Sequence, residues 1–271
     1  MKAPEETTVN TISSRDGTTI AYDKAGDGPT LILVDGALSV HSSGGKLELA
    51  RLLAPHLTVY GYDRRGRGGS GDTLPYAVDR EIEDIDALID HAGGSAFLYG
   101  HSSGGTLAMQ AAARLGGRVS KIAIYEPPHN DDPDAQESWS EYLGELGQLL
   151  ADGRRGDAVA LFMRLVGTPD DQVEGMRQAP FWPSMEAIAP TLAYDHAAIV
   201  GERFSVPTDL AARVSVPALV MAGEASLPFM PHTAWALSQA MPQARLRMLE
   251  GQTHDVNPGV LAPVLVDFFT S

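Results

Sequence analysis

The strongest chemical signal in this sequence is a serine at the centre of the pentapeptide Gly100-His101-Ser102-Ser103-Gly104. A short apolar stretch precedes it and an alanine-rich helical pattern follows it, which is the context that a nucleophile elbow requires. The serine of such a turn is exposed at a strand end, and glycines two residues away leave room where strand and helix nearly touch. Ser102 is therefore the predicted nucleophile of an acyl-transfer reaction.

His254 is the predicted general base, because it lies in a loop after the last predicted strand, late in the chain as the order Ser…His requires. Another histidine, His101, neighbours the serine, but it should point away from the site if Ser102 occupies an elbow. Seven histidines in all compete with His254, and none lies in such a loop: His41, His56, His91, His101, His129, His196 and His232.

Alternating strand and helix patterns must position these residues, and they predict an α/β protein with a mostly parallel sheet covered on both faces. The predicted strands are Thr7–Ser14, Thr18–Tyr22, Thr30–Val34, Leu57–Tyr62, Phe97–Tyr99, Lys121–Tyr125, Pro217–Ala222 and Ala244–Leu249. The predicted helices are Glu81–His91, Ser103–Leu115, Ser138–Leu150, Asp157–Val166, Thr233–Met241 and Leu261–Phe269.

Residues 129–213 interrupt this alternation, because they contain helical patterns and prolines but no convincing strand. A helical insertion between two halves of a parallel sheet is typical of a lid over a site at the strand ends. We therefore expect a core formed by residues 1–128 and 214–271, with residues 129–213 as a helical lid (cap).

Two further segments resemble motifs of the α/β-hydrolase superfamily. Asp63–Ser70 resembles its D-x-R-G-x-G-x-S segment after the fourth strand, and Gly251–Asp255 resembles its histidine loop. Together with the elbow and the lid, the resemblance covers nearly the whole chain and is closest to small lactonase- and esterase-like members. It implies the α/β-hydrolase fold, a mostly parallel twisted sheet with helices on both faces and a lid inserted after the sixth strand.

The acid of the catalytic triad departs from the superfamily pattern. Most members place an aspartate three residues after the glycine that ends the seventh strand, but here that position holds Ser226, which cannot stabilise an imidazolium as a carboxylate does. Glu126 ends the sixth predicted strand and precedes two prolines that fix the departing backbone. Some superfamily members, lactonases among them, take the acid from that position. Glu126 is the preferred acid, with Glu224 and then a lid carboxylate as alternatives.

The oxyanion hole should consist of backbone N–H groups. Ser103, directly after the nucleophile, is one predicted donor. Ala37, in the loop after the third strand, is the second, with Gly36 as its alternative. The superfamily usually carries His-Gly in that loop, and this chain has Asp35-Gly36.

Apolar clusters at Phe162-Met163, Phe181-Trp182 and Phe229-Met230 lie in the lid or at its border, where most such residues form core. Any that face the cleft would favour an apolar or aromatic substrate. Gly36, Trp182 and Met230 are the predicted substrate-binding residues. The segment Gly66–Gly71 fits G-x-G-x-x-G, but no helix follows it to bind a pyrophosphate, so a dinucleotide site is not expected.

The charge and composition of the chain indicate which kinds of partner it is expected to bind. The formal net charge of −15 opposes binding to nucleic acids and anionic membrane surfaces. The chain has no cysteine, and its N-terminus lacks the apolar region of a signal peptide, so a cytoplasmic protein is the default expectation. We expect a small-molecule substrate and no metal or organic cofactor; the oligomeric state is left open.

These residues predict a serine hydrolase that cleaves a carboxylic ester or lactone through an acyl-enzyme on Ser102. Two alternatives stay open on the same fold. One is a lyase or cyclase that uses Ser102 and His254 only for proton transfer. The other is a ligand-binding protein that keeps the triad but turns over slowly.

Overall fold

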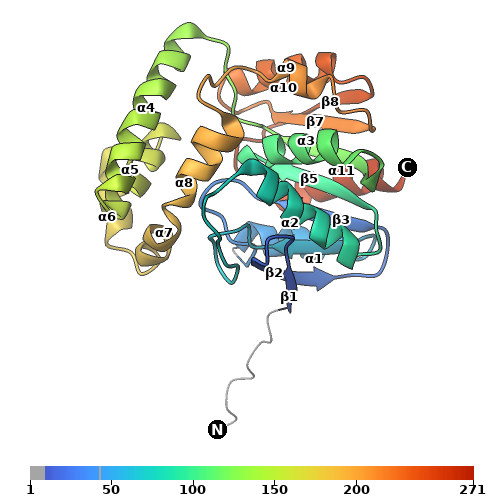
Figure 1. Cartoon of the computed structure of the whole chain (residues 1–271). Helices are drawn as coiled ribbons and strands as arrows, with labels where there is room; N and C mark the ends of the chain where they lie inside the picture. Colours follow the sequence, from blue (N-terminus) through green and yellow to red (C-terminus); the bar gives the residue numbers. More distant parts are fainter. Residues whose placement is uncertain (1–9, 43) are drawn as a thin grey trace.

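A mixed β-sheet forms the centre of the computed structural model, which describes residues 10–42 and 44–271 (Figure 1). Within those residues the sheet has eight strands in the order β1-β2-β4-β3-β5-β6-β7-β8. β2 pairs in antiparallel fashion with both β1 and β4, and all the other neighbouring strands, from β4 through β3 to β8, pair in parallel. The strands are β1 (Asn10–Ser13), β2 (Thr19–Ala25), β3 (Thr30–Val34), β4 (Thr58–Tyr62), β5 (Ala96–His101), β6 (Val119–Tyr125), β7 (Ala218–Gly223) and β8 (Ala244–Leu249).

Both faces of the central strands are buried, which explains their nearly continuous apolar sequences. In β3, Ile32 and Val34 face one hydrophobic cluster, whereas Leu31 and Leu33 face another on the opposite side. The helices α2 (Val78–His91), α3 (Ser103–Leu115) and α10 (Phe229–Ala240) contribute to the first cluster. The helices α1 (Gly44–Leu53) and α11 (Pro258–Thr270) contribute to the second.

The predicted α/β alternation is confirmed, with boundaries that differ by a few residues. Residues 7–9 of the first predicted strand lie outside the described residues. Helix α1 was missed, because it begins with Gly44-Gly45 and has only a weak amphipathic pattern. Leu49 and Leu53 bury the apolar face of α1 beside α11, so tertiary packing stabilises a helix that the local sequence does not predict.

Residues 129–213 carry helices between β6 and β7, and the described structure places no strand among them. They are α4 (Pro133–Ala151), α5 (Arg155–Leu165), α6 (Asp170–Arg177), α7 (Trp182–Ile188), α8 (Thr191–Ala193), the π-helix η2 (Tyr194–Val200) and α9 (Thr208–Ala211). α4 to α8 gather at one side of the sheet (Figure 1). We refer to residues 129–213 as the helical insertion; its role as a separate cap stays a prediction.

The order of the strands places a topological switch between β3 and β5, because the chain continues from β3 to β4 on one side and from β5 to β6 on the other. Ligand sites of open α/β sheets lie at the carboxyl ends of strands near such a point. Gly36, Ser102 and Glu126 follow or end β3, β5 and β6. The fold therefore gathers the predicted site residues at one edge of the sheet.

Candidate active site

Ser102 occupies a sharp turn between β5 and α3. Its backbone angles are φ 56° and ψ −131°, a conformation that L-residues rarely adopt and that stores about 1–3 kcal/mol of strain. A Cβ atom at Gly100 would lie 2.4 Å from the Gly104 carbonyl oxygen, and one at Gly104 would lie 2.2 Å from that of Val34. Only glycine fits at either position, so the turn has the steric requirements of a nucleophile elbow.

Glu126 and His254 are joined by a hydrogen bond. His254 Nδ1 lies 2.8 Å from Glu126 Oε2, as expected from the sequence. The Glu126 side chain is fully buried, while the His254 side chain is 34% exposed. With Nδ1 bound to the carboxylate, Nε2 is the ring nitrogen that is left to act as the predicted base.

The backbone around Glu126 brings its carboxylate next to the elbow. The last residue pair of β5 and β6 is His101 with Tyr125, and the Ser102 N–H donates to the Tyr125 carbonyl oxygen at 3.0 Å. Glu126 therefore lies one residue beyond the paired part of β6. Glu126 itself has a positive φ of 48°, which turns the chain sharply before Pro127. Positive φ in a non-glycine residue is unfavourable, and its presence at both Ser102 and Glu126 marks a constrained site.

Ser226 has a role that sequence reasoning missed. Its Oγ donates to Glu126 Oε2 at 2.8 Å, and the Gly223 N–H donates to Glu126 Oε1 at 2.7 Å. The superfamily's usual acid position therefore lies beside Glu126 and supports its carboxylate. The hydroxyl at 226 was a usable signal, because a serine there leaves room for a carboxylate from β6 and can bind it.

His101 contacts the histidine loop, which the sequence did not indicate. Its ring centroid lies 4.8 Å from that of His254, and its Nε2 is 3.0 Å from the His254 carbonyl oxygen. Burial and the nearby His254 lower the pKa of His101 well below its usual value, so it stays neutral and its Nε2–H donates. His101 thus supports the histidine loop from beneath, as does Tyr125, whose hydroxyl donates to the Thr253 carbonyl oxygen at 2.6 Å.

The loop after β3 lies against the nucleophile. A Cβ atom at Gly36 would stand 2.9 Å from Ser102 Cβ and 3.5 Å from Ser102 Oγ, so a side chain there would obstruct the reaction space. The loop turns at Leu38, with φ 50°. Ser103 begins α3, where backbone N–H groups lack helical partners and the helix dipole favours negative charge. The roles of Ala37 and Ser103 as oxyanion donors stay predictions.

A buried ion network behind this loop was also missed. Asp195 of η2 contacts Arg64 and Arg67 at 2.7 and 2.6 Å, and Arg64 forms a further bidentate pair with Glu81. All four side chains are at most 1% exposed. Arg64 and Arg67 occupy the variable positions of the D-x-R-G-x-G-x-S segment, so the motif gave no reason to expect them at the site.

The remaining predicted residues lie elsewhere. Glu224 is exposed, and the alternative that it pairs with His254 is not supported, because Glu126 fills that position. Trp182 is buried among Val159, Val173 and other apolar residues of the helical insertion, and its Nε1 donates to Glu186. Met230 is buried at the start of α10. Among the described residues, neither has a hydrogen bond or ring contact with Ser102, so their substrate contact stays a prediction.

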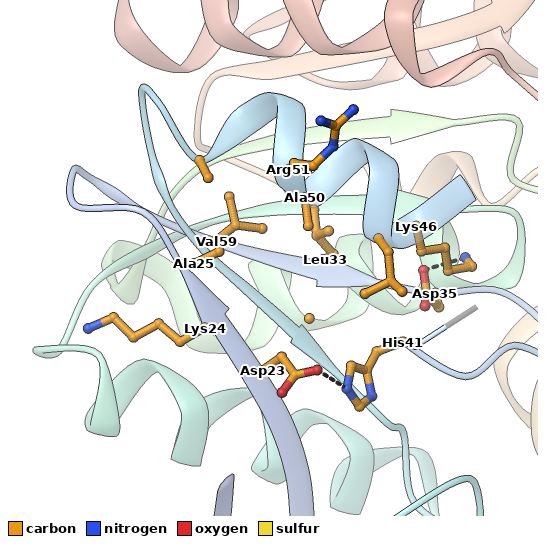
Figure 2. A pocket seen from close by; sticks show the side chains of 13 residues that line it. Asp23, Lys24, Ala25, Leu33, Asp35, His41, Lys46, Ala50, Arg51 and Val59 are labelled. Atoms are coloured by element: carbon orange, nitrogen blue, oxygen red, sulfur yellow. Dashed lines mark hydrogen bonds and ion pairs between the residues drawn. The ribbon is translucent and has the colours of Figure 1, made fainter. Parts of the chain in front are cut away.

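A cavity of about 230 Å³ lies beside α1 and the neighbouring strands rather than at Ser102 (Figure 2). At its edge His41 Nε2 is 2.7 Å from Asp23 Oδ2, and Nδ1 is 2.9 Å from Asp63 Oδ1. The close Asp63 carboxylate and the second carboxylate, Asp23, raise the pKa of His41 to about 9. Asp35 pairs with Lys46 there (Figure 2), so its side chain is engaged with α1.

The glycine-rich segment after β4 folds around its own aspartate. A Cβ atom at Gly68 would lie 2.0 Å from Asp63 Oδ2, and the Gly69 N–H donates to that oxygen at 2.8 Å. The next helix, α2, begins only at Val78, so no helix N-terminus directly follows Gly71. Over residues 10–42 and 44–271, no group of three His, Asp or Glu side chains is arranged to hold a metal ion.

Comparison with known proteins decides the family. A model of the alpha/beta hydrolase family matches residues 38–263, which include the elbow, Glu126 and His254. The chain belongs to the alpha/beta hydrolase family. An alpha/beta hydrolase from Sphaerobacter thermophilus has 50% sequence identity and a TM-score of 0.83, over 96% of this chain and 100% of that one.

More distant similar proteins carry names that denote different activities. An enol-lactonase from Burkholderia xenovorans is 22% identical, with a TM-score of 0.68 over 97% of this chain and 100% of its own. A protein named proline iminopeptidase PfmaB, from Pestalotiopsis fici, is 21% identical over 89% of this chain and 92% of its own. At such identities the likeness of structure shows the fold alone. The described helices of this hydrolase include none with the length and apolarity needed to cross a membrane.

Proposed function

We propose that this hydrolase cleaves a carboxylic ester or a lactone through an acyl-enzyme on Ser102. The observation that carries the proposal is the hydrogen bond from His254 to the buried Glu126, formed beside a strained serine elbow. A base oriented by a buried carboxylate is what a serine needs to become a nucleophile.

In the proposed acylation, Ser102 Oγ attacks the carbonyl carbon while His254 Nε2 takes the serine proton. The carbonyl oxygen becomes an oxyanion, which the N–H groups of Ala37 and Ser103 stabilise. The Glu126 carboxylate holds the His254 tautomer and stabilises the imidazolium. His254 then returns the proton to the leaving alkoxide as the carbon–oxygen bond breaks; in a lactone this oxygen stays attached to the acyl chain.

Deacylation repeats these steps with water. His254 takes a proton from the water, whose oxygen attacks the acyl carbon, and the proton passes to Ser102 Oγ as the acid is released. The serine, rather than an aspartate, at the elbow favours this acyl chemistry over alkyl transfer. Measured turnover distinguishes the proposed hydrolase from the non-hydrolytic and ligand-binding alternatives, because both alternatives predict little or no hydrolysis.

We further propose that the helical insertion caps the site and favours a small apolar or aromatic substrate. Ala37 and Leu38, next to the nucleophile, pack against a cluster of insertion residues that includes Trp139, Tyr142 and Leu192. Apolar side chains from the insertion thus adjoin residues 35–38, which we call the oxyanion loop. An apolar wall with a few convergent polar groups is typical of a small-molecule site.

The test measures turnover of short p-nitrophenyl esters and of lactones of graded ring size by the wild-type protein and by Ser102→Ala. We expect wild-type hydrolysis and, because the substitution removes only the nucleophilic oxygen, a loss of about 10⁴–10⁶ in rate. Circular dichroism would verify that the variant folds. Activity of Ser102→Ala within tenfold of wild type, or wild-type labelling by a fluorophosphonate without turnover of any ester or lactone, would contradict the proposal.

A further inference from the structure

Two arginines donate hydrogen bonds to backbone carbonyl groups of the oxyanion loop. Arg67 Nη1 donates to the Gly36 carbonyl oxygen at 2.7 Å, and Arg64 Nη1 donates to the Asp35 carbonyl oxygen at 3.1 Å. These two carbonyls belong to the peptide units whose N–H groups are on Gly36 and Ala37. In a trans peptide, C=O and N–H point in opposite directions. Fixing both carbonyls from one side therefore fixes the direction of both candidate oxyanion donors.

Ser103, the donor on the other side of the proposed oxyanion hole, is attached to the same network of Arg64, Arg67 and Asp195. Ser103 Oγ donates to Asp195 Oδ1 at 2.7 Å, and Asp195 also binds Arg64 and Arg67. One carboxylate thus connects the start of α3 with the loop after β3. The two halves of the proposed oxyanion hole come from segments more than sixty residues apart in the chain, and Asp195 joins them.

Asp195 belongs to the helical insertion rather than to the sheet and its covering helices. It lies in η2, a π-helix, and π-helical turns are frequent at functional sites. Burial would raise the pKa of its carboxyl group, but Arg64 and Arg67 lower that pKa to about 2, so Asp195 is ionised at neutral pH. Burial lowers the pKa of Arg67, yet a guanidinium stays protonated. Asp195, Arg64 and Arg67 therefore form a charged network that is almost completely buried.

We propose that Asp195, acting through Arg64, Arg67 and Ser103, positions the two N–H donors of the oxyanion hole; this inference rests on the proposed hydrolase function. Asp195 is a positioning residue, because it touches the groups that hold the donors and not the reacting atoms. The insertion therefore completes the catalytic site as well as covering it. Its removal should weaken the stabilisation of the oxyanion more than the binding of substrate.

The experiment compares p-nitrophenyl butyrate with p-nitrophenyl thionobutyrate, in which sulfur replaces the carbonyl oxygen. Sulfur accepts hydrogen bonds weakly, so an intact oxyanion hole favours the oxygen ester and a damaged one loses that preference. For Asp195→Asn we expect kcat for the oxygen ester to fall about 10- to 100-fold, with KM changed less than about threefold. The oxygen-to-sulfur rate ratio should fall about tenfold.

Asp84→Asn is the matched control. Asp84 forms an equally buried bidentate pair with Arg65, in the same segment, but Arg65 does not contact the oxyanion loop. This variant should lose stability while keeping the rate ratio of wild type. Ser103→Ala, which leaves the ion pairs intact, should lower the ratio by about threefold and covers the case in which Asp195→Asn does not fold.

The outcomes are distinct. An unchanged rate ratio in Ser103→Ala, and in Asp195→Asn if it folds, would overturn the positioning role while leaving the proposed function in place. An equal fall in the ratio for Asp84→Asn would also overturn it, because the effect would then be structural. A wild-type protein that hydrolyses neither ester, nor any other ester or lactone, would refute the proposed function itself and this inference with it.

Discussion

Two buried carboxylates flank the elbow, and their partners differ. Glu126 binds a histidine, a serine hydroxyl and a backbone N–H. Asp195 binds two guanidinium groups and a serine hydroxyl. Both side chains are fully buried, so exposure does not distinguish them.

The difference lies in whether the partner can change its charge. An imidazole can accept a proton and return it during a reaction, so Glu126 can stabilise a charge that appears on His254 only during catalysis. Arg64 and Arg67 stay protonated throughout, so Asp195 compensates a permanent charge and fixes geometry. A buried carboxylate therefore serves chemistry or structure according to its partner, and the predictions below test that distinction.

The largest expected effect among these predictions follows loss of the charge on Glu126. Glu126→Gln should keep the fold but lower kcat about 10²–10⁴-fold, because the amide no longer stabilises the imidazolium and favours the wrong tautomer of His254. The measurement is kcat and KM for the best ester or lactone. Unlike Asp195→Asn, this variant should slow the oxygen ester and the thionoester alike, since it acts on the base.

Glu224→Gln is the control for that prediction. Glu224 is an exposed carboxylate beyond β7 and is not bound to His254, so the variant should stay within about threefold of wild type. If Glu126→Gln were as active as Glu224→Gln, Glu126 would not be the acid, and the contrast with Asp195 would lose its basis.

A smaller effect is expected at His41, which pairs with Asp23 and Asp63 away from the elbow. Its pKa is raised to about 9 in the folded protein from about 6.5 in the unfolded chain. The stabilisation is thus fully present below pH 6.5 and is lost as the pH rises through 9. Because Asp23 is 57% exposed, we expect the loss to be about 1–2 kcal/mol of unfolding free energy.

Urea unfolding of wild type and His41→Asn at pH 6, 7.5 and 9 would measure this loss. The stability difference between the two proteins should shrink across that range, while activity at pH 7.5 stays unchanged in the variant. This would show that a histidine–carboxylate pair without a nearby nucleophile contributes only to stability. Parallel stability curves for the two proteins would contradict the role of His41.

The sequence predicted the elements whose patterns are local. The apolar run of β3, the alanine-rich α3 and the elbow between β5 and α3 each have short-range signatures, and the structure has them where expected. The sequence also provided a reason to prefer Glu126 as the partner of His254 over Glu224 or a lid carboxylate, because Ser226 stands where the superfamily usually has its aspartate. Helix α1 was not predictable in this way, since packing against α11 stabilises it.

The support around the site could not be read from the sequence. Asp195 lies 92 residues from Ser103 in the chain, and nothing in the segment Tyr194–Val200 indicates that it would meet Arg64 and Arg67. The contact of His101 was missed for a related reason. It joins His101 to the His254 loop, 153 residues away in the chain, and the elbow sequence alone does not indicate it.

The proposed hydrolysis proceeds through a covalent intermediate on Ser102. Rapid quenching of the reaction with a slowly deacylating p-nitrophenyl ester, followed by mass spectrometry of the intact protein and its peptides, tests it most directly. The expected result is one acyl group per molecule, located on Ser102 and absent from Ser102→Ala. Steady hydrolysis with no adduct on Ser102, or an acyl group on Ser103 that persists in Ser102→Ala, would contradict it.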